Sequence, residues 1–346
     1  MNVLSILTAI FISISIVLLG YTSYWYIAAE KIKNQVTELQ QKQILENREF
    51  IYTKMTIKGF PLKFETVFEN PKLKILNSDL EINTNKLIFS LRPWDYSTIT
   101  ITPKNRTSAL LTKGEVKENY SALLGSGIIK IRLENGLFKI FDVTISNLEL
   151  SSPFSQEAIT LSQLSAYVDV SGIEDYSGLE NKTVKSYLNI ENVGIPDNFG
   201  IEMGRYVEYF QLSASIFGKI SNGNIKNITQ NWRDSGGTIE IDDLQGRWGP
   251  LELNANGTLA LDSKMRPLAS LTSSVVGYGD MIDALIMSNA IPFGDAFLAK
   301  VAFNMLAEEE KDGGPRVLRN VPLTIQDGIL SVGPMEVGEI KPLHFY

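Results

Sequence analysis

The amino-terminal end of the chain is a long apolar run, with no charged side chain between Asn2 and Ala29. A helix needs about 20 mostly apolar residues to cross a hydrocarbon core of roughly 30 Å. The run from Val3 to about Tyr24 is that long, so we predict a membrane anchor over residues 1–29. The side chains expected in the hydrocarbon are Leu4, Leu7, Ile10, Phe11, Ile14, Val17 and Leu18.

Four aromatic residues follow the apolar core: Tyr21, Tyr24, Trp25 and Tyr26. Amphipathic aromatic side chains prefer the headgroup level of a bilayer, so we predict that these four lie at the membrane interface. A cleaved signal peptide and a buried helix of a soluble protein are the alternatives. Signal peptides begin with basic residues and end in a small-x-small cleavage site, and the sequence shows neither.

The positive charges near the apolar run lie on its C-terminal side, at Lys31, Lys33 and Lys42. Taken alone, they would keep that side in the cytoplasm. They are interleaved with glutamates, however, and a long domain is translocated despite a modest charge. The charge pattern therefore leaves the side of the membrane open.

Residues 30–49 are mostly polar and carry a stripe of Ile32, Val36 and Leu39. These spacings of four and three are typical of one face of an amphipathic helix. We predict a stalk helix that continues the anchor and docks on the following domain. A partner-binding coiled coil is the alternative for this segment.

From Phe50 onward, apolar and polar residues alternate with the period of two that is typical of strands with one buried face. Asn135-Gly136 and Asp327-Gly328 separate pairs of such runs and predict hairpins. Asn256-Gly257 separates two runs that keep the same apolar face, so we interpret Gly257 as part of a bulge. A short helix is expected around residues 224–232.

Strands in near-unbroken succession, without regular alternation with helices, favour antiparallel sheet. We predict a mainly β (α+β) fold: a large curved antiparallel sheet, an N-terminal transmembrane helix and a C-terminal helical hairpin. The β-rich domain is expected to span 50–346 and to contain the helices at about 280–309. Pro292 separates these two helices, because proline interrupts a helix. We expect each to dock on the sheet, or on a membrane, through one apolar face. These faces comprise Met281, Ile282, Leu285, Ile286 and Asn289 in the first helix, and Phe297, Leu298, Val301, Met305 and Leu306 in the second.

Composition excludes several classes of function. The 346 residues carry a net charge of -7, which argues against a nucleic-acid partner. The chain has no cysteine and one histidine, so disulfides, thiolate zinc sites and multi-histidine metal sites are excluded. His344 lies beside the chain end and is expected in solvent. Asp242 and Asp243 are adjacent on a strand, so we expect them on opposite faces. We predict no catalytic, cofactor-binding or metal-binding residues.

A series of short motifs resembles an uncharacterised family of bacterial, typically alphaproteobacterial, envelope proteins known as domain of unknown function 2125. These motifs are Gly20–Tyr26, Ile57–Leu62, Asn70–Leu73, Arg92–Trp94, Trp248–Leu251, Gly257–Leu259, Asn320–Leu323, Asp327–Leu330 and Gly333-Pro334. The resemblance spans nearly the whole chain and implies an inner-membrane protein with a single span and a periplasmic main domain. It brings no activity or ligand. In strand-rich layout only, the chain is also similar to AsmA-type envelope proteins associated with lipid homeostasis. Three of these motifs are expected to be structural: Phe60-Pro61, Arg92–Trp94 and Trp248–Pro250. Trp94 is expected to cover a sheet edge.

The first functional hypothesis is therefore a non-catalytic, membrane-anchored envelope protein whose β-rich domain binds or shields a lipid or other apolar component. A scaffold that binds another envelope protein through a sheet edge is the alternative. A carboxylate-dependent hydrolase is a remote third. The deciding observation is whether the helices at 280–309 fill the apolar face of the sheet or leave it open.

Overall fold

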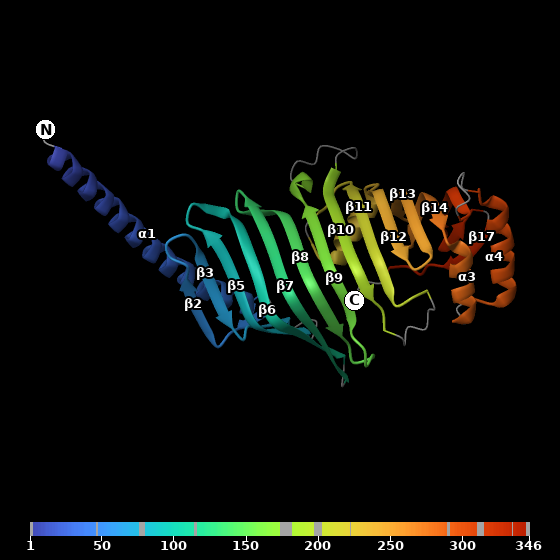
Figure 1. Cartoon of the computed structure of the whole chain (residues 1–346), viewed down its shortest axis with the longest axis horizontal. Helices are drawn as coiled ribbons and strands as arrows, with labels where there is room; N and C mark the ends of the chain where they lie inside the picture. The colour runs from blue at the N-terminus through green and yellow to red at the C-terminus, as the bar shows by residue number, and fades with distance from the viewer. Residues whose placement is uncertain are drawn as a thin grey trace. The chain divides into compact units, whose positions relative to one another are not determined.

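The computed structural model describes residues 3–45, 48–75, 80–113, 116–173, 182–196, 203–221, 223–288, 291–309, 315–333 and 335–343. The chain divides into two compact units, Met1–Gly136 and Leu137–Tyr346. Figure 1 draws their helices and strands, coloured along the chain. His344 lies outside the described residues, as does Asn289.

The first unit is a long helix followed by an antiparallel sheet. Its elements are α1 (Val3–Leu45), β1 (Arg48–Ile51), β2 (Lys54–Lys58), β3 (Phe64–Glu69), β4 (Lys72–Ile75), β5 (Leu80–Arg92), β6 (Asp95–Lys113) and β7 (Val116–Glu134). β1 pairs with β4 and β2 pairs with β3, while β3 and β4 both pair with β5. β5, β6 and β7 then follow as a meander of long strands.

Asn70 interrupts the strand that β3 and β4 would otherwise form. Its φ of 48° lies in the left-handed region, which asparagine tolerates better than most residues. The pairing with β5 keeps the same register on both sides of it. The apolar positions nevertheless change parity there, from Phe64 and Phe68 before Asn70 to Leu73 and Ile75 after it. A strict period of two therefore fails at this point of the sequence.

The second unit is an antiparallel meander with three α-helices. Its elements are β8 (Leu137–Ser151), β9 (Ile159–Asp169), the 3-10 helix η1 (Ser171–Ile173), β10 (Lys182–Gly194), β11 (Tyr206–Phe217), α2 (Ile225–Asp234), β12 (Thr238–Trp248), β13 (Leu251–Leu261), β14 (Pro267–Val276), α3 (Tyr278–Met287), α4 (Phe293–Leu306), β15 (Val317–Gln326), β16 (Ile329–Val332) and β17 (Met335–Glu339). Each strand from β8 to β16 pairs with the next strand along the chain. The predicted fold class is confirmed: mainly β and antiparallel, with an N-terminal apolar helix and a C-terminal helix pair.

The predicted turns and the short helix are also found. β7 ends and β8 begins around Asn135-Gly136, and β15 pairs with β16 across Asp327-Gly328. β13 runs without interruption through Gly257, which is therefore no hairpin tip. The register shift between β12 and β13 lies opposite it, so the extra residue of the bulge is on β12.

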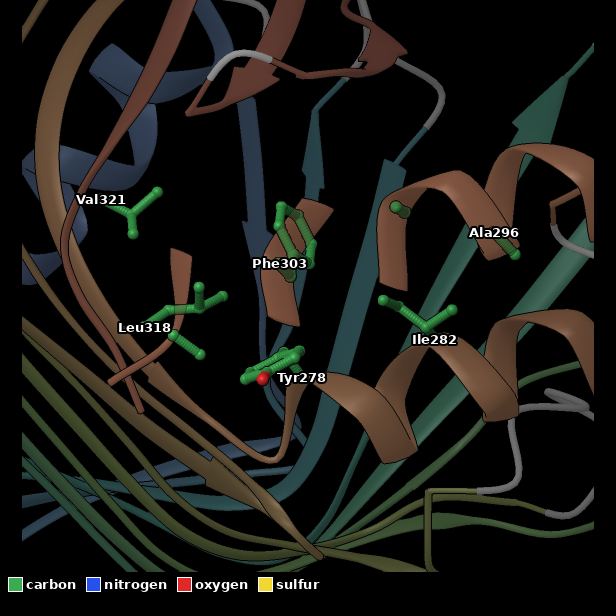
Figure 2. Packing of buried hydrophobic residues seen from close by; sticks show 8 residues of the cluster. Tyr278, Ile282, Ala296, Phe303, Leu318 and Val321 are labelled. Carbon is green, nitrogen blue, oxygen red and sulfur yellow. The ribbon is translucent and has the colours of Figure 1, made fainter. Parts of the chain in front are cut away.

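α3 and α4 pack against the C-terminal strands of the second unit (Figure 2). Tyr278 and Ile282 of α3 meet Phe303 of α4, and Leu318 and Val321 of β15 complete the cluster. Leu318 is 1 % exposed and the rings of Tyr278 and Phe303 meet edge to face, with centroids 6.0 Å apart. This cluster is the main core of the second unit in the described residues.

The face that α4 turns toward this core differs from the predicted one. The buried residues are Ala296, Ala299, Phe303 and Ala307. The side chains predicted to dock are instead exposed: Phe297, Leu298, Val301, Met305 and Leu306. Because α4 is apolar on most of its circumference, hydrophobicity alone does not select its buried face. The small alanines let the helix approach the strands closely, and this packing decides the orientation.

Candidate functional site

Each unit offers one candidate site: in the first unit, the helix α1 with its docking contacts, and in the second unit, the apolar side of its sheet. Within the described residues, the segment Ile10–Gln40 of α1 is long and apolar enough to cross a membrane. Its exposed side chains include Ile10, Phe11, Ile14, Val17 and Leu18. Leu4 and Leu7 lie in the same helix, but their side chains are outside the described ones. The membrane location of these side chains stays a prediction.

Trp25 joins α1 to the sheet of the first unit. Its side chain is 3 % exposed and stacks on the ring of Phe64, with centroids 5.1 Å apart. The indole N–H donates a hydrogen bond of 3.3 Å to the carbonyl oxygen of Lys63, and the ring meets Phe60 edge to face. Ala29 is buried in the same cluster. Among the four predicted interfacial aromatics, Trp25 is thus held within the protein.

The tyrosines beside Trp25 bind two turns of the sheet. Tyr21 donates a hydrogen bond to the carbonyl oxygen of Pro61, and Tyr24 donates one of 2.8 Å to that of Pro93. The hydroxyl of Tyr24 also bonds that of Tyr96. Tyr96 is 51 % exposed, and the partial desolvation of its hydroxyl, followed by the hydrogen bond with Tyr24, raises its pKa to about 12.

After Trp25, α1 continues along the sheet of the first unit as far as β1. Ile32 packs on the Trp25 cluster, and Val36 is partly buried. Leu39, which the predicted stripe included, is exposed, and Gln40 takes the next inward position. Its amide donates a hydrogen bond of 2.8 Å to the carbonyl oxygen of Phe50. The stalk is therefore the docked part of one continuous helix. The predicted boundaries at 29/30 and 49/50 fall inside α1 and β1.

Apolar side chains remain exposed around the docked tyrosines. They belong to Tyr26 on α1, to Phe60 and Leu62 in the turn between β2 and β3, and to Trp94 in the turn between β5 and β6. Leu62 is 65 % and Trp94 62 % exposed. The sequence predicted that Trp94 covers a sheet edge, and in the structure its side chain lies largely exposed in the turn. Trp248 does play a structural role, since its indole N–H donates a hydrogen bond of 2.9 Å to the carbonyl oxygen of Gly204.

The sheet of the second unit has one apolar side. Cross-strand pairs such as Ala166 with Leu188, Leu188 with Leu212, and Leu212 with Leu244 place apolar residues on a common side. We call this surface the apolar face. Its members are Leu164, Ala166, Val168, Leu188, Ile190, Phe210, Leu212, Ile216, Ile239, Ile241, Leu244, Leu253 and Leu259, from β9 to β13. These residues are partly exposed, while Val184, Ala214 and Ala255 on the same side are buried, as are Leu271 and Leu318 on the strands next to α3 and α4.

The opposite side of the same strands is polar. It carries serines, amides and charged groups, such as Ser165, Gln211, Ser213 and Asn254. Strand residues alternate between the two sides of a sheet, so one residue step along β11 separates the apolar Leu212 from the polar Ser213.

Asp242 and Asp243 lie on this polar side together, contrary to expectation. Asp243 pairs across the sheet with Ser213, and Asp242 accepts a hydrogen bond of 3.0 Å from the hydroxyl of Ser215. Ser213 and Ser215 share a side because they are two residues apart. The bulge in β12 therefore cancels the alternation that would have separated the two aspartates.

The described residues contain no group of three or more histidine, aspartate or glutamate side chains positioned to hold a metal ion. The strongest polar cluster joins two turns of the second unit. Arg266 donates a hydrogen bond of 2.6 Å to Asp262 and one of 2.9 Å to Asp327. Burial would raise the pKa of Asp262, but hydrogen bonds from Arg266 and the Lys264 N–H outweigh it and hold the pKa below its usual range.

Residues 25–341 match the profile of a bacterial family described as an uncharacterised conserved protein (DUF2125). The chain belongs to this family. The match begins at Trp25, the residue that docks α1 on the sheet, and ends after β17. No curated protein matches the chain.

Proposed function

We propose that this DUF2125 protein is a non-catalytic, membrane-anchored envelope protein whose β-rich body binds or shields the acyl chain of a lipid or another apolar component. The observation that carries the proposal is the apolar face, which spans five strands and keeps thirteen of its apolar side chains partly exposed. Exposed apolar patches of this extent are typical of interaction sites.

The chemistry of the face fits an acyl chain. An acyl chain presents only methylene groups, so the surface that receives it needs no polar partner. Exposure of such a chain to water costs about 0.8 kcal/mol per methylene group. Transfer between a bilayer and another apolar surface avoids most of this cost. A body tethered to a membrane by α1 has such chains within reach.

Photo-crosslinking in cells tests this proposal. Cells that express the full chain are fed a diazirine-bearing fatty acid, irradiated, and the lipid-modified peptides are identified by mass spectrometry. We expect adducts on peptides of β9–β13 in addition to adducts on α1. Leu212→Lys should reduce the β9–β13 adducts severalfold, because it places a charge on the apolar face.

Ser213→Lys is the matched control, since it places the same charge one residue away on the polar side. It should leave the adducts unchanged. Adducts on α1 serve as the internal reference in every sample, and thermal unfolding shows whether each variant is folded. If adducts occurred on α1 alone, or if both variants behaved alike, the lipid proposal would be refuted.

We further propose the inner membrane as the location and the periplasm as the side of the main domain, as the resemblance implies. The chain has no cysteine, so an introduced one is its only thiol. Ser126→Cys provides an exposed site on β7. In intact spheroplasts it should react with a membrane-impermeant maleimide. Reaction only after lysis would place the domain in the cytoplasm.

A scaffold that binds another envelope protein is the second candidate, and the outward side of α4 favours it. Phe293, Phe297, Val301 and Met305 follow one another at intervals of four and are all exposed, Met305 by 82 %. A photo-crosslinking amino acid at Met305 should give one discrete protein adduct that Phe297→Asp abolishes. The same group at the exposed turn residue Lys264 is the control. Lipid adducts alone at Met305 would contradict the scaffold.

A further inference from the structure

Two turns of the first unit lie beside the point where α1 leaves the membrane. The rise of an α-helix is about 1.5 Å per residue, so the 18 residue steps from Val3 to Tyr21 span about 27 Å. This is close to the roughly 30 Å thickness of a hydrocarbon core. Tyr21 is therefore expected near the headgroup level, and its hydroxyl is bonded to Pro61 in the turn between β2 and β3.

The contacts along α1 fix which end of the sheet faces the membrane. Tyr21 and Tyr24 bind the turns at Pro61 and Pro93. Gln40, 19 residues after Tyr21, binds Phe50 in β1. At about 1.5 Å per residue, this places β1 roughly 28 Å further from the membrane than the two turns. The tips of the turns are thus the part of the sheet nearest the bilayer.

The side chains at these tips are those that a bilayer interface accepts. Phe60 and Leu62 project from the first turn, and Trp94 and Tyr96 from the second, all exposed. Tryptophan and tyrosine favour the headgroup level, where one edge meets hydrocarbon and the polar group meets water. Lys58, beside the first turn, is exposed, but its ammonium lies 3.9 Å from the carboxylate of Glu65, so the case for this contact rests on the apolar and aromatic side chains rather than on charge.

We propose that the turn at residues 59–63 and the turn at 92–96 insert into the headgroup region of a phospholipid bilayer beside α1. The first unit then contacts the membrane at two places in addition to the helix. Trp25 makes no contact with the bilayer in this proposal, because its buried side chain packs between α1 and the turn at residues 59–63. The proposal rests on α1 as the membrane anchor, and it adds a second lipid contact that the anchor alone does not require.

Depth-dependent fluorescence quenching tests this contact. The full chain is reconstituted in vesicles of three parts phosphatidylcholine to one part phosphatidylglycerol. Single cysteines are introduced as Leu62→Cys or Trp94→Cys and labelled with an environment-sensitive nitrobenzoxadiazole dye. We expect a spin label on the lipid headgroup to quench both positions severalfold more than a label at Ile51→Cys in β1.

Val17→Cys is the positive control for the anchor, and a spin label deep in the acyl chain should quench it. If Val17 is quenched while positions 62 and 94 match position 51, the inserted turns are refuted and the anchor stands. If Val17 is not quenched, the anchor fails and the proposed function fails with it. Trp94→Glu in the Leu62→Cys background provides a second measurement. It should lower the quenching at position 62, whereas Thr56→Glu on β2 should not.

Discussion

The replacement of Trp25 by alanine tests how α1, the candidate membrane helix, is held to the body of the protein. Trp25 is the most buried aromatic residue of α1 and contacts Phe60, Lys63 and Phe64. The substitution removes the ring stack, the edge-to-face contact and the hydrogen bond together. It leaves the helix intact, because alanine is the best helix former.

The loss can be estimated from the area involved. A buried tryptophan removes about 150–250 Å² from water. At about 25 cal/mol per Å², this corresponds to about 4–6 kcal/mol. Substitutions of buried tryptophan by alanine typically cost about 3–5 kcal/mol, because the methyl group remains and the site partly collapses. We therefore expect the free energy of unfolding of the first unit to fall by about 3–5 kcal/mol.

Hydrogen exchange in detergent micelles measures this effect region by region. The amides of Leu62 and Lys63 both donate hydrogen bonds to the carbonyl oxygen of Gly59, so they report on the turn beside Trp25. Their exchange should accelerate strongly in Trp25→Ala. Ile27→Ala is the control, since Ile27 is on the same helix but exposed. Equal protection in the two variants would show that the Trp25 cluster does not hold the helix to the sheet.

Two further predictions concern the second unit. Gly277→Ala should destabilise it by more than about 1 kcal/mol, because its φ is 74° and a Cβ would lie 1.9 Å from the carbonyl oxygen of Pro250. Thermal unfolding should show no such loss for Gly279→Ala, whose nearest neighbour would be 3.7 Å away. Asp262→Asn should lower stability at pH 7, because Asp262 with its lowered pKa favours the folded state above the pKa of the unfolded chain. The difference from wild type should disappear as the pH falls through the lowered pKa of the folded state; urea unfolding that shows a constant difference down to pH 2 would contradict the role of Arg266.

The sequence predicts the strands and the apolar helix because both depend on simple periodicities. Runs such as Leu164–Val170 alternate regularly, and the structure places them in antiparallel pairs. The run before Tyr24 needs only length and the absence of charge. Such features depend on many residues together, so single exceptions do not hide them.

The errors arise where one local feature overrides the period. The bulge in β12 brings Asp242 and Asp243 to the same side of the sheet, and the identities of these two residues do not predict a bulge. At Asn70 the apolar positions of the sequence change parity, while the pairing with β5 keeps its register. On α4, small residues rather than large ones face the core, with Ala296 fully buried. These outcomes depend on backbone conformation and close packing, which a hydrophobic pattern does not record.

The docking surface of α1 could be recognised only in part. The sequence predicts the docked stripe of Ile32 and Val36. It places Trp25 at the membrane interface, because Trp25 lies among tyrosines. Its partner Phe64 is 39 residues away, so no local pattern connects them. The sequence does not predict the contact of Gln40 either. Its hydrogen bond to Phe50 depends on the path by which the chain folds back from the end of α1 into β1.

The uninterrupted course of α1 from Val3 to Leu45 has a mechanical consequence. No proline or glycine pair provides a hinge between the apolar segment of α1 and the segment that packs on the first unit's sheet. A helix whose apolar length exceeds the local bilayer thickness responds by leaning. If α1 spans a bilayer as proposed, the attached strands must lean with it, so a thinner membrane would tilt the first unit toward its surface and a thicker one would bring it upright.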